Sequence, residues 1–193
     1  MPRAFIALAL GEQSRKAVAA QINRLRPLSK AITWTPPANL HLTLRFLGDQ
    51  SDEQLSEVLL ALQEAADGVS GFTMGLRGLG AFPGLEHPRT IWVGVSAGGP
   101  EVRELQARVS EALARRGTPA DSRAWQAHVT IGRVPVQKRW RREGMADIRS
   151  GLIRGGATTF GSTHVTSIEV MRSDLRPSGA RYTPIASVPL ASE

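Results

Sequence analysis

Short apolar runs and alternating apolar and polar positions recur along the chain and predict β-strands. The expected strands cover residues 5–10, 32–35, 40–46, 72–79, 90–96, 126–134, 163–171 and 182–190. The first run is apolar throughout, which is typical of a strand buried on both faces. Pro36 and Pro37 separate the second strand from the third, because proline cannot donate to a sheet ladder.

Segments between these strands carry the marks of helices. The predicted helices cover residues 12–26, a stretch from 51 through at least 62, residues 100–116 and residues 138–154. Pro27 ends the first, and Ser51-Asp-Glu-Gln54 has the form of a capping box that opens the second. Pro100 stands at the start of the third, and Gly117 follows its basic last turn. The chain therefore mixes helices and strands from end to end.

No linker or low-complexity stretch is long enough to divide the chain, so residues 1–193 are expected to form a single unit. No apolar run approaches the roughly 18 residues of a membrane span. The apolar run near the N-terminus is brief and leads directly into a polar helix, which favours a first strand over a signal peptide. We therefore expect a cytoplasmic protein with no membrane partner.

The composition of the chain excludes several kinds of functional site. The chain has no cysteine, which excludes disulfides, a thiol nucleophile and cysteine-ligated metal sites. Its four histidines are scattered and show no zinc-ligand spacing, so neither a metal nor another cofactor is expected. The formal net charge of +7 favours anionic partners such as nucleic acid or phosphate esters.

Two segments of predicted strands share the form His-x-Thr-x with apolar x. They are His41-Leu42-Thr43-Leu44 and His128-Val129-Thr130-Ile131, about half the chain apart, as a two-lobed internal duplication would place them. Because side chains alternate along a strand, the histidine and threonine of each motif share one face and the apolar residues share the other. One face of each strand can join the core while the other lines a groove.

Two histidines that face each other across a groove suit a phosphodiester substrate. One neutral imidazole can take a proton from water while one imidazolium gives a proton to the leaving oxygen, since histidine titrates close to neutrality. The hydroxyls of Thr43 and Thr130 can donate to phosphate oxygens where negative charge accumulates. A third copy, His164-Val165-Thr166, is interpreted as structural, because its histidine and threonine share parity with apolar residues of the expected strand 163–171.

Residues 34–48, with the sequence WTPPANLHLTLRFLG, closely resemble the first signature of the 2H phosphoesterases. The branch is that of the bacterial and archaeal RNA 2′,3′-cyclic phosphodiesterases (LigT/ThpR-like), which is also linked to 2′–5′ RNA ligase activity. Residues 78–83, 91–94, 171–175 and 179–183 are similar to later blocks of that branch, so the resemblance spans nearly the whole chain.

The resemblance implies an α+β fold of two similar α/β lobes, with facing, mainly antiparallel sheets that form a central cleft and with helices outside. It also implies a function, the metal-independent hydrolysis of an RNA terminal 2′,3′-cyclic phosphate to a 2′-phosphate. In that scheme His41 is the proton donor, His128 the proton acceptor, and Thr43 and Thr130 hold the phosphate. Ala127 departs from the proline common before the second histidine, but it lies outside the His-Thr face.

Three further residues are candidates for substrate binding. Arg133 follows the second motif, but strict alternation puts it opposite His128, so it reaches a phosphate only if the strand bends or ends near Gly132. Arg45 shares parity with His41 and Thr43, which can extend the site or leave it on a solvated edge. Tyr182 can touch substrate by analogy with the family, and packing explains it equally well.

The basic segment and the function of the chain each admit more than one interpretation. The basic segment 138–154 contains Trp140 and suits an RNA backbone with a stacking base, or a solvated helix. Phe46 and Leu47 are expected in the core. The alternatives to hydrolysis are a 2′–5′ RNA ligase that joins tRNA halves and a non-catalytic RNA-binding protein. The expected partners are RNA with cyclic phosphate ends or cyclic nucleotides, and nothing in the pattern demands more than a monomer.

Overall fold

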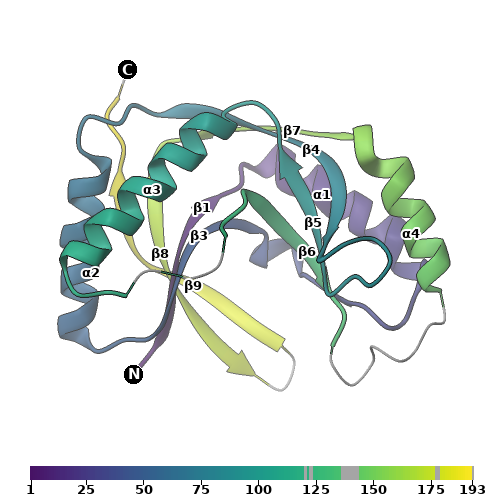
Figure 1. Cartoon of the computed structure of the whole chain (residues 1–193), viewed down its shortest axis with the longest axis horizontal. Coiled ribbons are helices and arrows are strands. Elements are labelled where there is room, and N and C mark those ends of the chain that lie inside the picture. The colour runs from purple at the N-terminus through teal and green to yellow at the C-terminus, as the bar shows by residue number, and fades with distance from the viewer. Residues whose placement is uncertain (120, 122–123, 136–143, 177–178, 193) are drawn as a thin grey trace.

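The computed structural model describes residues 1–119, 121, 124–135, 144–176 and 179–192. In this part of the chain, strands and helices are interspersed from one end to the other, as Figure 1 shows. The strands are β1 (Arg3–Ala9), β2 (Thr33–Trp34), β3 (His41–Asp49), β4 (Phe72–Phe82), β5 (Thr90–Val95), β6 (His128–Arg133), β7 (Thr159–Val165), β8 (Ser167–Arg176) and β9 (Gly179–Pro189). The α-helices are α1 (Glu12–Leu25), α2 (Asp52–Ala66), α3 (Gly99–Arg115) and α4 (Met145–Arg154).

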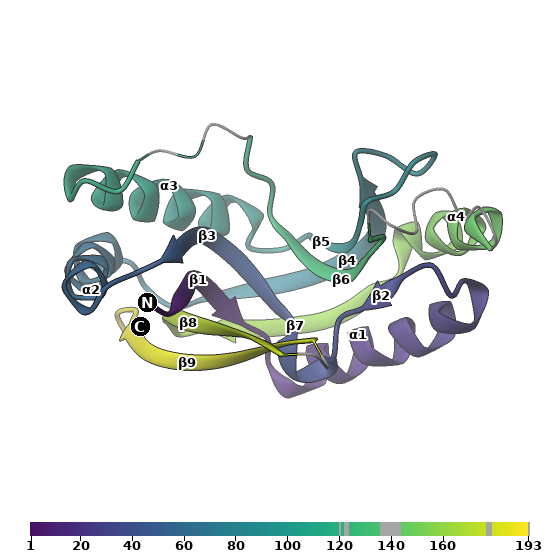
Figure 2. The ribbon, with the colours of Figure 1, turned by 90° about the horizontal axis from the view of Figure 1, so that it is seen from below.

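The strands form one curled sheet in the order β7-β4-β5-β6-β3-β1-β8-β9, with β2 paired to β6. Each pair of neighbouring strands named in this order is antiparallel. The middle of the chain builds one half of the sheet (β4 to β7), and the two ends of the chain build the other half (β1, β3, β8 and β9). Figure 2 shows the strands curling between two pairs of helices.

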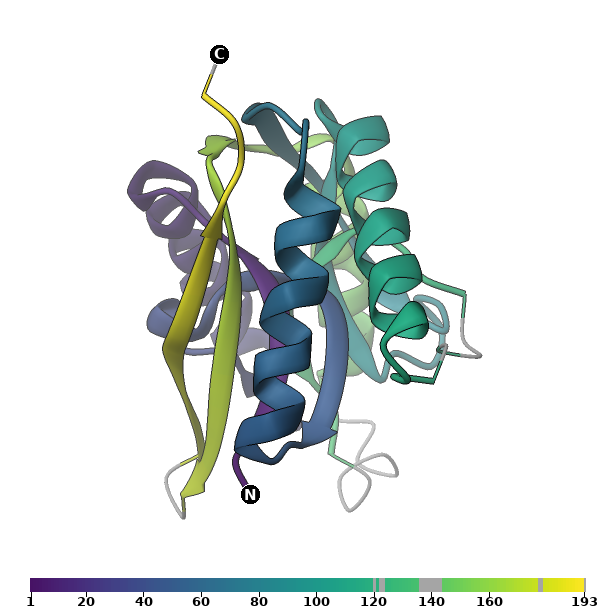
Figure 3. The same ribbon diagram turned by 90° about the vertical axis from the view of Figure 1, so that its left-hand side faces the viewer.

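The helices pack on the sheet in two pairs. Helices α2 and α3 pack side by side, as Figure 3 shows; α2 contacts β9, and α3 contacts β3 and β4. Helix α1 contacts β7 and helix α4 contacts β4, in the half of the sheet formed by β4 to β7. Helix α1 follows β1 along the chain but packs on the opposite half, so the two halves exchange elements and hold each other together.

The predicted helix signals account for the helix ends. In α2 the Ser51 hydroxyl accepts from the Gln54 amide and the Gln54 side chain accepts from the Ser51 amide, which completes the predicted capping box. Helix α3 begins with Pro100 in its first turn and buries the apolar stripe that the spacing predicts. Helix α4 covers only the second part of the predicted segment 138–154, and residues 136–143, including Trp140, lie outside the described residues.

The prediction of one strand over residues 163–171 is wrong. Strand β7 ends at Val165, Thr166 breaks the ladder, and β8 begins at Ser167. Strand β7 pairs with β4 in one half, whereas β8 pairs with β1 and β9 in the other. The chain thus crosses between the halves at the point where the buried positions change parity, from Val165 to Ile168 and Val170.

The expected α+β class, with a mainly antiparallel sheet and helices outside, is confirmed. The core fills the space between the sheet and the helices, and the fully buried Leu42 and Val129 belong to it. Within the part of the chain that the structure describes, no helix has the length and apolar character to cross a membrane.

Candidate active site

The two His-x-Thr motifs lie side by side where the halves of the sheet meet. Strands β3 and β6 share one residue pair, Leu42 with Val129, and both side chains are fully buried. In an antiparallel pair, the residues that flank such a pair point to the other face and oppose each other crosswise. His41 therefore stands opposite Thr130 and Thr43 opposite His128, with all four side chains on one face.

The ring of His41 is fixed on both nitrogens. Its Nδ1 donates to the Asn39 carbonyl at 2.7 Å, so in the neutral ring Nε2 carries no proton. The Thr43 hydroxyl donates to that Nε2 at 3.0 Å. The rings of Phe5 and Tyr182 pack against the imidazole, with centroids 4.7 Å and 5.3 Å away. The site nitrogen of His41 is thus ready to accept a proton and lies against aromatic walls.

His128 repeats this arrangement from the other half of the sheet. Its Nδ1 donates to the Gln126 carbonyl at 2.7 Å, again two residues earlier in the chain, and leaves Nε2 for the site. Phe82 packs edge-on against the ring with a centroid distance of 5.0 Å. Each histidine therefore has one backbone carbonyl that fixes its tautomer and an aromatic neighbour that excludes water from one side.

Burial and charge lower the pKa of both histidines. Desolvation lowers the pKa of His41 from 6.5 to about 4, although the bond to the Asn39 carbonyl favours the charged ring. The pKa of His128 is also lowered, chiefly by desolvation. The nearby Arg133 cation lowers both pKa values, and His128 itself lowers that of His41. These effects place the two rings and Arg133 close enough to interact electrostatically.

A bulge in β6 turns Arg133 toward the histidines. Thr130 pairs with Trp92 and Gly132 pairs with Ile91, so Ile131 is an extra residue in β6. Arg133 then pairs with Thr90, which has the same parity on β5 as Trp92 and Gly94. Since Gly94 pairs with His128, Arg133 faces the same side as His128 and Thr130. Strand β6 thus has the bend near Gly132 on which a role for Arg133 depends, so its side chains do not alternate strictly between the two faces there.

A matching bulge in β3 has the opposite effect on Arg45. Thr43 pairs with Ala7 but Arg45 pairs with Ile6, which leaves Leu44 as the extra residue. The bulge turns Arg45 away from the face of Thr43, but Arg45 still lines the hollow that His128 borders. Its guanidinium donates to the Pro119 carbonyl. A part for Arg45 in substrate binding stays a prediction.

The same bulge corrects the expectation for Phe46. It pairs with Phe5 on the face of the histidines and is 57% exposed, so it is not a core residue, whereas Leu47 is partly buried against the core. Tyr182 lies on this face as well, because it pairs with Ser173 and contacts both Phe5 and His41. Tyr182 therefore stands beside the first motif.

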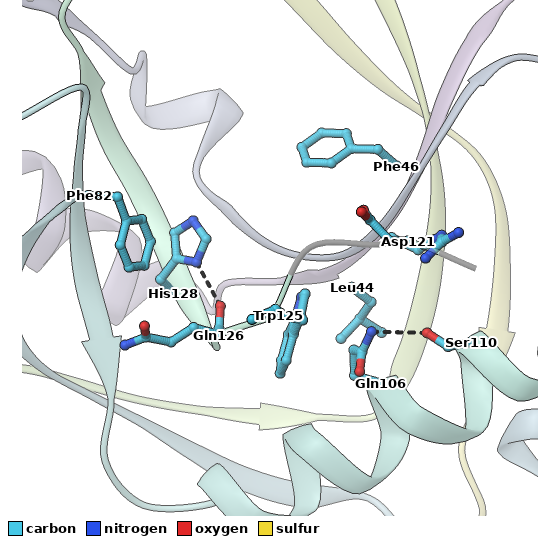
Figure 4. A pocket seen from close by; sticks show the side chains of 11 residues that line it. Leu44, Phe46, Phe82, Gln106, Ser110, Asp121, Trp125, Gln126 and His128 are labelled. Carbon is cyan, nitrogen blue, oxygen red and sulfur yellow. Dashed lines mark hydrogen bonds between the residues drawn. The ribbon is translucent and has the colours of Figure 1, made fainter. Parts of the chain in front are cut away.

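Two hollows flank the motif pair. One of about 200 Å³ lies beside His41, with Tyr182, Arg15 and Met171 among its walls. The other, of about 500 Å³, lies beside His128, and Figure 4 shows Phe46, Phe82, Trp125 and His128 around it. Each histidine therefore borders a space large enough for part of a ligand.

Side chains beyond the predicted set complete the site. Phe5 and Phe82 wall the two histidines, and the Trp125 indole donates to the Thr43 carbonyl at 3.1 Å. These partners come from strands and loops that only the sheet topology brings together, so no local signal marks them. The third motif lies elsewhere, and its His164 is exposed rather than on the core face, because the break at Thr166 changes the parity.

Comparisons with known proteins agree with this geometry. A model of the 2′-5′ RNA ligase superfamily matches residues 14–176. An RNA 2′,3′-cyclic phosphodiesterase of Aquifex aeolicus is 33% identical over 182 residues, which cover 94% of this chain and 93% of the relative. One of Methanothermobacter thermautotrophicus is 30% identical over 182 residues, with 94% and 95% covered.

Solved structures show the same fold. The crystal structure of the Thermus thermophilus protein TT0787 has a TM-score of 0.74 at 28% identity and covers 99% of both chains. Escherichia coli LigT complexed with 3′-AMP has a TM-score of 0.74 at 24% identity and covers 98% of both chains. The resemblance inferred from the paired motifs is thus confirmed at the level of sequence and fold. The chain belongs to the 2′-5′ RNA ligase superfamily.

Proposed function

We propose that this chain hydrolyses the terminal 2′,3′-cyclic phosphate of RNA to a 2′-phosphate, without a metal ion. The observation that carries the proposal is the crossed register of the two motifs, in which His41 and His128 each leave Nε2 unprotonated on one shared face. The relatives that are named RNA 2′,3′-cyclic phosphodiesterases support this substrate. One chain carries both histidines, so a monomer in the cytoplasm suffices for the reaction.

The proposed reaction moves one proton at each histidine. His128 Nε2 takes a proton from the attacking water, whose oxygen forms the new bond to phosphorus. Protonated His41 gives its Nε2 proton to the ribose 3′-oxygen as the bond from that oxygen to phosphorus breaks. The 2′-oxygen keeps its bond, so the product is a 2′-phosphate. The donor and acceptor roles follow from the resemblance to the family.

Three side chains would hold the phosphate between the rings. Arg133 supplies a fixed positive charge on the face of the histidines, and Thr130 offers a hydroxyl. Thr43 donates to His41 in the free protein. When His41 takes up a proton, its Nε2 becomes a donor, and the Thr43 hydroxyl is then free to donate to a phosphate oxygen.

The bound phosphate would also favour the protonated form of His41, which the proposed reaction requires. In the free protein burial and Arg133 hold the pKa of His41 at about 4, so the ring is neutral at pH 7. A phosphate anion beside Arg133 offsets that cation and favours the imidazolium form. Substrate binding thereby raises the pKa of His41 and readies it as the proton donor.

The joining of RNA ends through a 2′–5′ linkage is the second candidate. It needs room for a nucleoside on each side of the phosphorus, and the separate hollows beside His41 and His128 favour it. Tyr182 borders the first hollow and Phe46 the second, so each offers an aromatic surface to a base or a ribose. Both reactions would use the same pair of histidines.

Product analysis separates these reactions. An oligonucleotide with a 2′,3′-cyclic phosphate end is incubated with the protein in excess chelator, with and without an acceptor that carries a 5′-hydroxyl. We expect a 2′-phosphate end as the main product in both samples. A joined product that depends on the acceptor would favour the ligase, and tight binding with no new product would favour a non-catalytic RNA-binding protein. A requirement for added metal would contradict the proposed mechanism.

A further inference from the structure

The contact between the two motif-bearing strands is narrow. Strand β3 pairs with β1 at seven positions and β6 pairs with β5 at five, but among the described residues β3 and β6 pair only at Leu42 and Val129. The position of His128 relative to Thr43 and His41 therefore depends on whatever else ties the two strands together.

Trp125 makes such a tie. Its indole Nε1 donates to the Thr43 carbonyl at 3.1 Å, across 82 positions of sequence. Thr43 stands at the bulge of β3, where the ladder with β1 is interrupted. The ring itself is partly buried against the core. A donor from outside the sheet thus fixes the backbone of the first motif where its own ladder is irregular.

The residue after Trp125 acts on the second motif. The Gln126 carbonyl accepts from His128 Nδ1 at 2.7 Å and sets the tautomer and direction of that ring. The Trp125 side chain therefore links the segment that orients His128 to the strand that carries Thr43. A change in the length of that bond would shift Gln126 and, with it, the His128 ring.

We propose that Trp125 is a positioning residue, whose indole N–H sets the placement of His128 relative to Thr43 across the joint between β3 and β6. Its effect on turnover rests on the proposed function, whereas its effect on the His128 ring does not. The hydrogen bond from Trp125 to the Thr43 carbonyl is what positions His128, whereas the packing of the indole ring contributes separately to stability.

Two substitutions separate the bond from the packing. Trp125→Phe removes the N–H and keeps an aromatic ring. Trp34→Phe is the matched control, because the Trp34 indole nitrogen is buried and has no hydrogen-bond partner among the residues that the structure describes. Both variants lose the same atoms from a partly buried ring that packs against the core. Only the first loses a hydrogen bond.

The experiment measures kcat and KM on a 2′,3′-cyclic nucleotide, melting temperature, and the titration of the His128 ring by NMR. For Trp125→Phe we expect kcat to fall about 10- to 100-fold with KM nearly unchanged, since a small misplacement of a reacting group costs this much. We also expect the pKa of His128 to rise toward its ordinary value, because a loosened segment admits water. Trp34→Phe should change neither quantity.

Several results would overturn the proposal. An unchanged kcat with an unchanged His128 titration would show that the bond positions nothing. A raised KM at constant kcat would make Trp125 a substrate contact, and an equal loss in Trp34→Phe would reduce the effect to packing. If Trp125→Phe fails to fold, benzothienylalanine at position 125 replaces the N–H by sulfur at full ring size. If the wild-type protein turns over no cyclic phosphate, the proposed function fails while the His128 titration still decides the role of Trp125.

Discussion

His41 and His128 come from different halves of the sheet and are held by the same device. In each, Nδ1 donates to the carbonyl of the residue two positions earlier, and Nε2 remains for chemistry. A donor bond to a backbone carbonyl leaves one neutral tautomer and one ring orientation. Since the same local geometry serves both rings, the different roles proposed for them must come from the surroundings, which are Arg133, Thr43 and the aromatic walls.

The effect of the Arg133 charge on the two histidines can be tested by substitution. Its cation lowers the pKa of His41 and of His128 in the free protein. We therefore predict that Arg133→Gln raises both pKa values, and that Arg133→Lys, which keeps the charge, leaves them closer to wild type. Titration of the two rings by NMR measures this directly. Unchanged pKa values in Arg133→Gln would mean that Arg133 does not face the rings.

The low pKa of His41 also predicts how stability depends on pH. The folded protein protonates His41 near pH 4, whereas the unfolded chain protonates it near 6.5. Between these values the unfolded chain binds more protons, so the free energy of unfolding falls as the pH falls from 6.5 to 4. The shift corresponds to a loss of at most about 3 kcal/mol by pH 4.

Urea titrations of the wild-type protein and of His41→Gln at several pH values check this prediction. The variant has no imidazole at position 41 to protonate, so its stability should fall less steeply over the same window. His128 contributes a slope of the same sign in both proteins, because its pKa is lowered too. Parallel curves for the two proteins would show that His41 titrates normally in the folded state.

Among the elements, the paired bulges decide which side chains reach the site. Period-two alternation correctly predicts that histidine and threonine share a face within each motif. It fails immediately afterwards, where the extra residues Leu44 and Ile131 reverse the parity. Arg133 and Phe46 thereby reach the face of the histidines, whereas Arg45 turns from the face of Thr43 and lines the hollow beside His128. A bulge depends on the register with the neighbouring strand, which no single strand sequence contains.

Helix ends, by contrast, are specified by a few neighbouring residues. The capping box of α2 allows this to be tested. Ser51→Ala removes the acceptor for the Gln54 amide, and we predict a loss of roughly 0.5–2 kcal/mol in the free energy of unfolding. Turnover should not change, because α2 packs over the core face of the sheet and the histidines lie on the other face. Ser56→Ala is the control, since Ser56 bonds only the Asp52 carbonyl within the same helix. Equal stability of both variants would contradict the role of the cap.

For the whole molecule, sequence patterns and the family resemblance predict the α+β class and the meeting of two distant motifs. They do not predict that β8 and β9 return to the half built by β1 and β3, because the change of parity after Val165 does not say which strand β8 joins. The same crossing explains His164. It has the residue pattern of the motifs, but the crossing leaves it exposed on β7, an edge strand of the sheet.

That third motif provides the control for the most direct test. Turnover of a 2′,3′-cyclic nucleotide is measured for His41→Ala, His128→Ala and His164→Ala, with circular dichroism to verify folding. We predict that each of the first two variants loses about 10²–10⁴-fold in turnover, as expected for the loss of a general acid or base. His164→Ala should keep the wild-type rate. Wild-type turnover in either His41→Ala or His128→Ala would contradict catalysis by the histidine pair.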